Sequence, residues 1–327
     1  MKLTFYGVRG SHPQTDQDMT RYGGDTTSLR IVSASGDEYM FDAGSGAIKL
    51  GKELMGQYRG QVRAKVFITH DHWDHIQGFP FFIPAYVPGC EVDVYSGDKK
   101  LAAKLVAQTR TSDTAFIKRS QLEKEIQGDT VVLNKGPERN HTKDVFAGQQ
   151  NVEGGYFPVP ISAMSSNLRF HDLKEDFVVQ NGLSVSYRYF NEISHPGGMF
   201  SYKIQEGNKR IVFGGDYEHD GADYGIFGEN DKRLIEWTEG ADALVIDGQY
   251  TPEEYLKKKK WGHSQIERIC EIAAQAHVKQ LYITHHDPDH TDSKLDSMHE
   301  QAQRFMTHHL KQDIPVIFAK QKMEVTL

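Results

Sequence analysis

The chain is organised around Thr69-His70-Asp71-His72-Trp73-Asp74-His75, which places three imidazoles and two carboxylates within seven residues. The segment directly follows the apolar run Val66-Phe67-Ile68, which is typical of a strand. Zinc, manganese and iron bind neutral imidazole nitrogen and carboxylate oxygen, so this composition indicates a metal site. A solvated histidine-rich loop is the alternative, but such a loop is expected in a polar tract rather than at a strand end.

The spacing within the cluster predicts two ions rather than one. His70 and His72 lie two residues apart, so in an extended segment both rings point the same way and can bind one ion. Asp74 and His75 follow after a turn and are available to a second ion nearby. A closed structural zinc is disfavoured, because such sites rely on cysteine and the chain has only two, far apart in sequence.

Composition and charge narrow the class of protein. With 327 residues, 38% hydrophobic and 25% charged, the chain is long enough for a sizeable core, and we expect one α/β domain, residues 1–327. No apolar run approaches the roughly 20 residues that span a bilayer, and the N-terminus lacks the apolar core of a signal peptide. We therefore expect a cytoplasmic protein that does not bind membranes. The net charge of −7 argues against a broad nucleic-acid surface.

A run of lysines, residues 257–260, stands just before Trp261-Gly262-His263. One interpretation is a solvated helix end. The other is an anchor for a phosphate-bearing substrate, in which Lys260 contacts the substrate.

Several predicted strands end at residues that can bind metal. Residues 3–7, 29–32 and 38–41 form an opening β-meander that ends at Asp42. In the second half, four strand ends lead into His195, Asp216, Asp247 and His285-His286. Such a pattern is expected when the strand ends converge on one edge of a two-sheet sandwich.

An insertion at about residues 111–165 interrupts this pattern. Residues 98–110 and 115–127 have helical composition, and residues 128–160 are rich in Gly, Asn, Pro and charge. We interpret residues 128–160 as a long excursion over the surface, serving as a lid or a dimer arm.

The motif Thr-His-x-His-x-Asp-His after a strand resembles the signature of the metallo-β-lactamase-fold hydrolases. The Phe213-Gly214-Gly215-Asp216 and Gly262-His263-Ser264 segments extend the resemblance over most of the chain, and the match is nearest to the ribonuclease Z and cyclic-phosphodiester branch. The resemblance implies an α/β fold with four αββα layers. Dimers are common in this family, so a homodimer is an expectation.

The joined segments give a full set of seven metal ligands. The first ion is assigned to His70, His72 and His195, and the second to Asp74, His75 and His285, with Asp216 bridging. His285 is preferred to His286, because Thr284-His285 repeats Thr69-His70 and resembles the last ligand of the family. By the same resemblance Asp42 orients a ligand histidine from behind, with an Asx turn or a helix cap as the alternative.

The expected catalytic residues are Asp74, which is also a ligand, and His263. In ribonuclease Z-like proteins a histidine in this Gly-His-Ser setting is thought to protonate the leaving alkoxide, a task that suits a group of near-neutral pKa. A helix cap is the alternative role for His263, and His290 is the alternative acid. The expected substrate contacts are His286, His290 and Lys260.

The metals predict hydrolysis more firmly than they predict a substrate. Two cations lower the pKa of a shared water to about neutrality, which gives a bridging hydroxide. A cyclic nucleotide or other small phosphodiester is the first choice, because the acidic charge weighs against a large RNA. The alternative is transfer-RNA 3′ processing, so RNA stays a candidate substrate. Zinc is the first choice of metal, with manganese or iron as alternatives.

Two other classes share parts of this pattern. One is a non-catalytic regulatory protein that binds metal or nucleotide, although no expected ligand is missing here. The other is the flavodiiron oxygen reductases, which typically carry a carboxylate at the position of His72 and work with a flavin domain.

Overall fold

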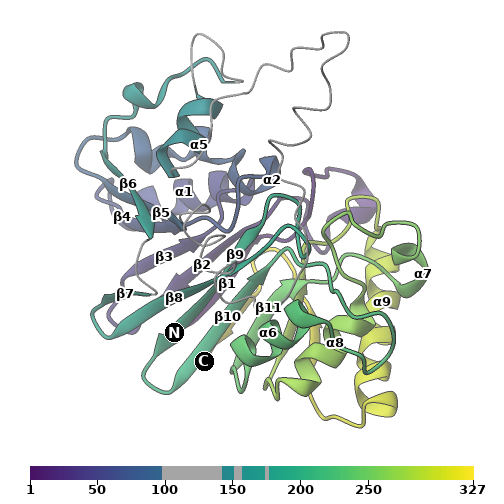
Figure 1. The fold of residues 1–327 in the computed structure, drawn as a ribbon. Coiled ribbons are helices and arrows are strands. Elements are labelled where there is room, and N and C mark those ends of the chain that lie inside the picture. Colours follow the sequence, from purple (N-terminus) through teal and green to yellow (C-terminus); the bar gives the residue numbers. More distant parts are fainter. Residues whose placement is uncertain (98–141, 151–156, 174–176) are drawn as a thin grey trace, which may run out of the picture.

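Two sheets face each other between two sets of helices in the computed structural model, which describes residues 1–97, 142–150, 157–173 and 177–327 (Figure 1). Each sheet has seven strands among these residues. The helices of the first half cover the outer face of the first sheet, and those of the second half cover the second sheet. The expected four-layer αββα arrangement is confirmed.

The first sheet has the order β14-β1-β2-β3-β4-β5-β6. Its strands are β1 Lys2–Gly7, β2 Ser28–Val32, β3 Glu38–Phe41, β4 Arg63–Phe67, β5 Glu91–Gly97, β6 Asn167–Leu173 and β14 Glu324–Thr326. The meander β1 to β3 is antiparallel, as expected, and β3 to β6 are parallel.

The second sheet has the order β13-β12-β11-β10-β9-β8-β7. Its strands are β7 Phe177–Gln180, β8 Leu183–Phe190, β9 Met199–Glu206, β10 Lys209–Gly215, β11 Ala243–Asp247, β12 Leu281–Thr284 and β13 Val316–Phe318. Strands β10 to β13 are parallel, so their carboxyl ends meet at one edge of the sheet.

The helices fall into the same two halves. The first half has α1 Gly46–Gln57, α2 Trp73–Ile76 and α5 Thr142–Gln149, and the second has α6 Glu229–Thr238, α7 Pro252–Tyr255, α8 Ile266–Gln275 and α9 Asp292–Arg304. Short 3-10 turns are η1 Gln17–Met19, η2 Phe79–Phe81, η3 Ile83–Tyr86 and η4 Ile161–Ala163, and a π-helical turn, η5, covers Phe305–His309.

Alternation of side chains along the strands builds the layers. In β10, Ile211 and Phe213 enter the core between the sheets, whereas Val212 packs toward the helices of the second half. A period of two is what places successive residues on opposite faces of a sheet. The apolar face of α8 is buried against this outer face of the sheet and consists of Ile266, Ile269, Cys270 and Ala273.

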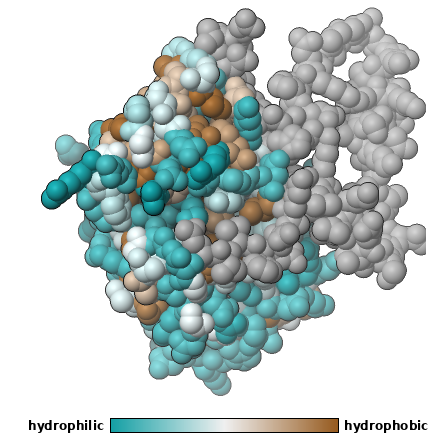
Figure 2. All heavy atoms as spheres, turned by 90° about the vertical axis from the view of Figure 1, so that its left-hand side faces the viewer, coloured by the Kyte–Doolittle hydropathy of each residue, from teal (hydrophilic) through white to brown (hydrophobic). Residues whose placement is uncertain are grey.

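The insertion is only partly described. The helices expected at residues 98–110 and 115–127 lie outside the described residues. The expected surface excursion is wrong for α5, because Phe146 is fully buried and its tilted ring packs on Phe79 with ring centroids 4.3 Å apart. Figure 2 shows a mostly hydrophilic face, on which apolar residues gather in the upper part.

Among the described residues, no helix combines the length and the apolar character needed to cross a membrane.

Candidate metal centre

Seven titratable side chains from both sheets meet at the carboxyl ends of the strands. His70, His72 and His195 form one cluster, called here the three-histidine group. Asp74, His75, Asp216 and His285 form a second cluster, called here the carboxylate group. Within each group the candidate ligand atoms lie within 4.8 Å of one another. The sequence places them apart, and the strand ends bring them together.

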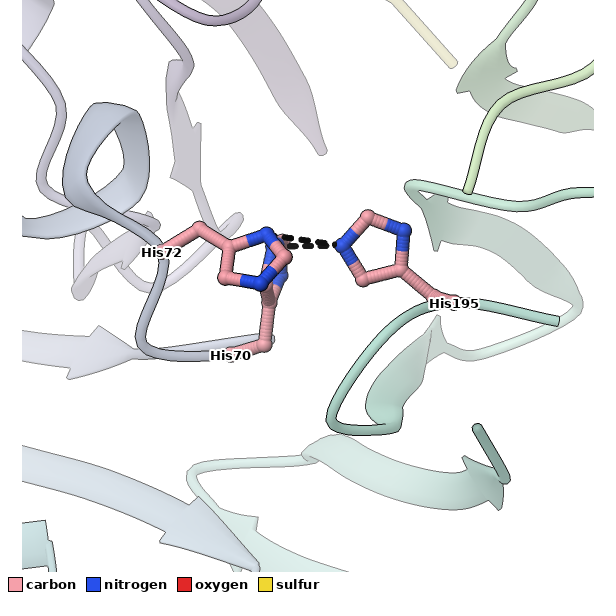
Figure 3. Close-up of side chains that lie close together, drawn as sticks. All are labelled: His70, His72 and His195. Atoms are coloured by element: carbon pink, nitrogen blue, oxygen red, sulfur yellow. Dashed lines mark hydrogen bonds between the residues drawn. The ribbon is translucent and has the colours of Figure 1, made fainter. Parts of the chain in front are cut away.

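In the three-histidine group, His195 faces two histidines from the other sheet (Figure 3). Its Nε2 atom lies 3.0 Å from Nε2 of His70 and 2.9 Å from Nδ1 of His72. Burial is the main cause that lowers the pKa of His70 well below its usual range and that of His195 to about 3. These rings are therefore neutral imidazoles, the form that binds metal ions.

In His70 and His195, the ring nitrogen that faces away from the cluster has a hydrogen-bond partner of its own. His195 Nδ1 lies 2.8 Å from the carbonyl oxygen of Gly262, to which it donates. His70 Nδ1 lies 3.0 Å from the hydroxyl of Thr69. Because partners of this kind orient a metal-binding histidine, the free nitrogens converge on a common point.

In the carboxylate group, Asp216 has the central place. Its Oδ2 atom lies 3.0 Å from Nε2 of His75 and 3.1 Å from Nε2 of His285. The same oxygen is 3.7 Å from Nε2 of His70, in the other group. Asp74 completes the set, with its Oδ2 atom 3.0 Å from Nε2 of His285. Asp216 thus touches both groups, as a bridging carboxylate must.

Asp42 lies directly behind His75. Its Oδ2 atom accepts from His75 Nδ1 at 2.8 Å, and its Oδ1 atom accepts from the backbone N–H of Thr69 at 2.8 Å. The N-cap of α1 is Ser45, so Asp42 does not cap that helix. The geometry agrees with the orienting role expected for Asp42 and excludes the capping alternative.

The charge of the site favours cations. Four buried carboxylates, Asp42, Asp74, Asp216 and Asp247, form ion pairs only with histidines among the described residues. Burial would raise the pKa of Asp216, but the positive charges of His285 and His75 outweigh it and hold this pKa well below its usual range. Burial would lower the pKa of His285, but Asp216 and Asp74 raise it to about 10. Buried carboxylates and imidazoles together fit divalent cations.

His263 lies beside both groups, on the turn before α8. Its ring centroid is 4.8 Å from that of His285 and 5.5 Å from that of His195. Its Nδ1 atom lies 3.0 Å from Oδ2 of Asp247, a fully buried carboxylate at the end of β11. The sequence marked Asp247 as a strand-end residue but assigned it no role. Its pairing with His263 could be found only from the tertiary structure.

His285 and His286 differ in where their rings lie, and of the two only His285 belongs to a described cluster of candidate ligands. His286 is buried on the opposite side, with Nε2 2.9 Å from the carbonyl oxygen of Ala319. The structure therefore contradicts the expected substrate contact of His286.

The structure also contradicts a substrate or acid role for His290. Its buried side chain lies 3.1 Å from Glu254, through Nε2 and Oε1. Lys260, in contrast, is exposed beside the site, two residues before Gly262.

Comparisons with known proteins give matches to a family model, to curated relatives and to solved structures. The family model of the Beta-lactamase superfamily domain matches residues 149–286, a span that contains His195, Asp216 and His285. Ribonuclease Z from Oenococcus oeni is 22% identical and is covered over 99% of each chain. Among solved structures, yeast PDE1 has a TM-score of 0.60 at 12% identity, covering 100% of this chain and 99% of that one. Zn(2+)-bound PqqB from Methylobacterium extorquens has a TM-score of 0.56 at 13% identity and full coverage of both chains.

The structural neighbours show that the chain has the metallo-β-lactamase fold. The family model covers the second half of the described fold, and two curated relatives that match nearly the whole chain, from Oenococcus oeni and Brevibacillus brevis, carry the name Ribonuclease Z.

Proposed function

We propose that this chain hydrolyses phosphodiester bonds, with a cyclic nucleotide or other small phosphodiester as the first choice of substrate. The proposed ligands of two divalent cations are His70, His72 and His195 for one ion, Asp74, His75 and His285 for the other, and Asp216 for both. When bound, the cations supply Lewis acidity and a water of near-neutral pKa. Zinc is our first choice, with manganese or iron as alternatives.

The pairing of His263 with Asp247 is the observation that supports a phosphodiester rather than a lactam or thioester. A ribose oxygen leaves far more easily once it is protonated, and a histidine is suited to that transfer. Asp247 accepts from Nδ1 of His263 at 3.0 Å, which leaves Nε2 to donate to the leaving oxygen. Asp74 accepts from the backbone N–H of Ser11 at 2.8 Å, so its carboxylate is fixed in the site. We assign Asp74 the proton of the attacking water.

His263→Gln tests the acid role. For a cyclic nucleotide, whose leaving group is an alkoxide, we expect kcat to fall by about 10²- to 10⁴-fold. For bis(p-nitrophenyl) phosphate the fall should be much smaller, because p-nitrophenolate leaves without a proton. Steady-state kinetics of the metal-loaded protein measure both values. Equal losses on the two substrates would remove His263 from the acid role.

Transfer-RNA 3′ processing is the second candidate. The full-length relatives named Ribonuclease Z support it, as do the exposed side chains of Lys257, Lys259 and Lys260. A panel of cyclic nucleotides and precursor transfer RNA, assayed with metal analysis on the same sample, separates the two activities. Tight nucleotide binding without turnover would instead indicate a regulatory protein.

The expected homodimer stays a prediction, and analytical ultracentrifugation of the protein tests it.

A further inference from the structure

An exposed tryptophan stands beside the metal centre on a tightly held turn. Trp261 directly precedes Gly262, whose carbonyl oxygen lies 2.8 Å from Nδ1 of His195. A Cβ atom at Gly262 would lie 2.5 Å from the same nitrogen, so the turn packs closely on the ring of His195. Trp261 is nevertheless 60% exposed. Large aromatic side chains are usually buried, so an exposed one beside a candidate site is available for contact with another molecule.

Glu218 holds this turn in place. Its buried carboxylate, 6% exposed, accepts from the backbone N–H of Lys260 at 2.5 Å and from that of Gly262 at 2.7 Å. Lys260 has a φ of 70°, a left-handed conformation that is strained for a residue with a side chain. Strain of this kind persists only where the surroundings impose it, and it clusters at ligand-binding sites.

Rings and a cation connect Trp261 with His263. The ammonium of Lys258 lies 6.0 Å from the ring centroid of Trp261 and 4.5 Å from that of Tyr250. The ring of Tyr250 is in turn 6.0 Å from the ring of His263. Lys258 is fixed there by an ion pair of 2.7 Å with Asp287. Lys258 is therefore near both the exposed indole and the ring of Tyr250, with its charge paired to Asp287.

This arrangement fits a planar base attached to a phosphate. Aromatic side chains bind bases of any sequence by stacking, and adjacent lysines attract the backbone phosphates. The exposed lysines at positions 257, 259 and 260 supply further charge of the right sign. We propose that Trp261 is a stacking platform for the base of the substrate, presented beside the metal centre by the turn 260–262. This inference rests on the proposed function and deepens it, because it names a nucleotide rather than any phosphodiester.

Binding of AMP and of ribose 5-phosphate to the metal-loaded protein tests the proposal. The two probes share sugar and phosphate and differ in the base. By isothermal titration calorimetry we expect AMP to bind about ten-fold more tightly than ribose 5-phosphate, and Trp261→Ala to abolish that ratio. Trp261→Phe should restore part of it. Leu256→Ala is the matched control, because Leu256 lies on the same segment and is 69% exposed, and it should keep the ratio.

Glu218→Gln tests how the turn is presented. A neutral amide is a weaker acceptor for two N–H groups than a carboxylate, so we expect the ratio to fall part of the way toward that of Trp261→Ala. Binding of a short oligoadenylate distinguishes the source of the base. Affinity well above that of AMP indicates an RNA chain, and equal affinity indicates a mononucleotide.

An unchanged AMP to ribose 5-phosphate ratio in Trp261→Ala would overturn the stacking role and leave the proposed hydrolysis untouched. Conversely, a ratio that depends on Trp261 in a protein that hydrolyses no phosphodiester would leave the platform standing without the proposed function. The two failures are therefore distinguishable.

Discussion

The three-histidine group and the carboxylate group lie side by side but differ in charge. The first offers three imidazoles, and burial lowers the pKa of His195 among them to about 3. The second contains two carboxylates, and Asp216 and Asp74 raise the pKa of His285 to about 10. Two ions bound here would therefore experience different electrostatic potentials. Substitutions can be chosen that change one group more than the other.

Removing the carboxylate that the groups share has the largest expected effect. In Asp216→Asn the oxygen 3.0 Å from His75 and 3.7 Å from His70 loses its charge. We expect bound metal to fall from two ions toward one, and kcat to fall by about a thousand-fold or more, because several kcal/mol of charge stabilisation are lost. Elemental analysis and kinetics measure the two effects. Asp296→Asn, at an exposed aspartate, is the control. Two retained ions with full activity would contradict the bridging role.

Asp42→Ala should affect the carboxylate group more than the three-histidine group. Its carboxylate holds Nδ1 of His75 directly at 2.8 Å, whereas it reaches His70 only through the hydroxyl of Thr69. Loss of such an orienting partner typically costs 10- to 100-fold in metal affinity. We expect that loss for the ion of the carboxylate group and a smaller loss for the other ion, measured by competition with a chelating dye. Equal weakening of both ions would show that the groups are not independent.

The smallest effect concerns the choice of metal. Carboxylate donors suit manganese, and imidazole donors suit zinc. Protein loaded with equal amounts of zinc and manganese should therefore hold manganese preferentially at the carboxylate group. Anomalous diffraction at the two absorption edges locates each metal. Random occupancy would show that the difference in charge does not select the ion.

The fold and the seven clustered residues could be predicted because each signal is local. His70 and His72 follow an apolar strand at a spacing of two, and Asp216 and His285 end strands of the second sheet. Convergence of the parallel strand ends then brings distant residues together. The order of the strands along the chain is enough to predict that these residues meet.

The errors have a different physical origin. At His285 a φ of 57° turns the chain, so the next ring, that of His286, points into the core. No sequence pattern predicts this left-handed backbone conformation at a residue other than glycine. The roles of Glu218 and Asp247 were missed because their partners, the turn 260–262 and His263, meet them only through tertiary folding.

The origin of the ligands in two sheets gives the bound cations a mechanical role. His70 to His75 follow β4 of the first sheet, whereas Asp216 and His285 follow β10 and β12 of the second. An ion held by both sets acts as a clamp across the sandwich, so resistance to heat should track the free cation concentration. Above the dissociation constant, each ten-fold increase adds about 1.4 kcal/mol per ion to the free energy of unfolding. Removal of the metal ions would thus lower the stability of the fold as well as the activity.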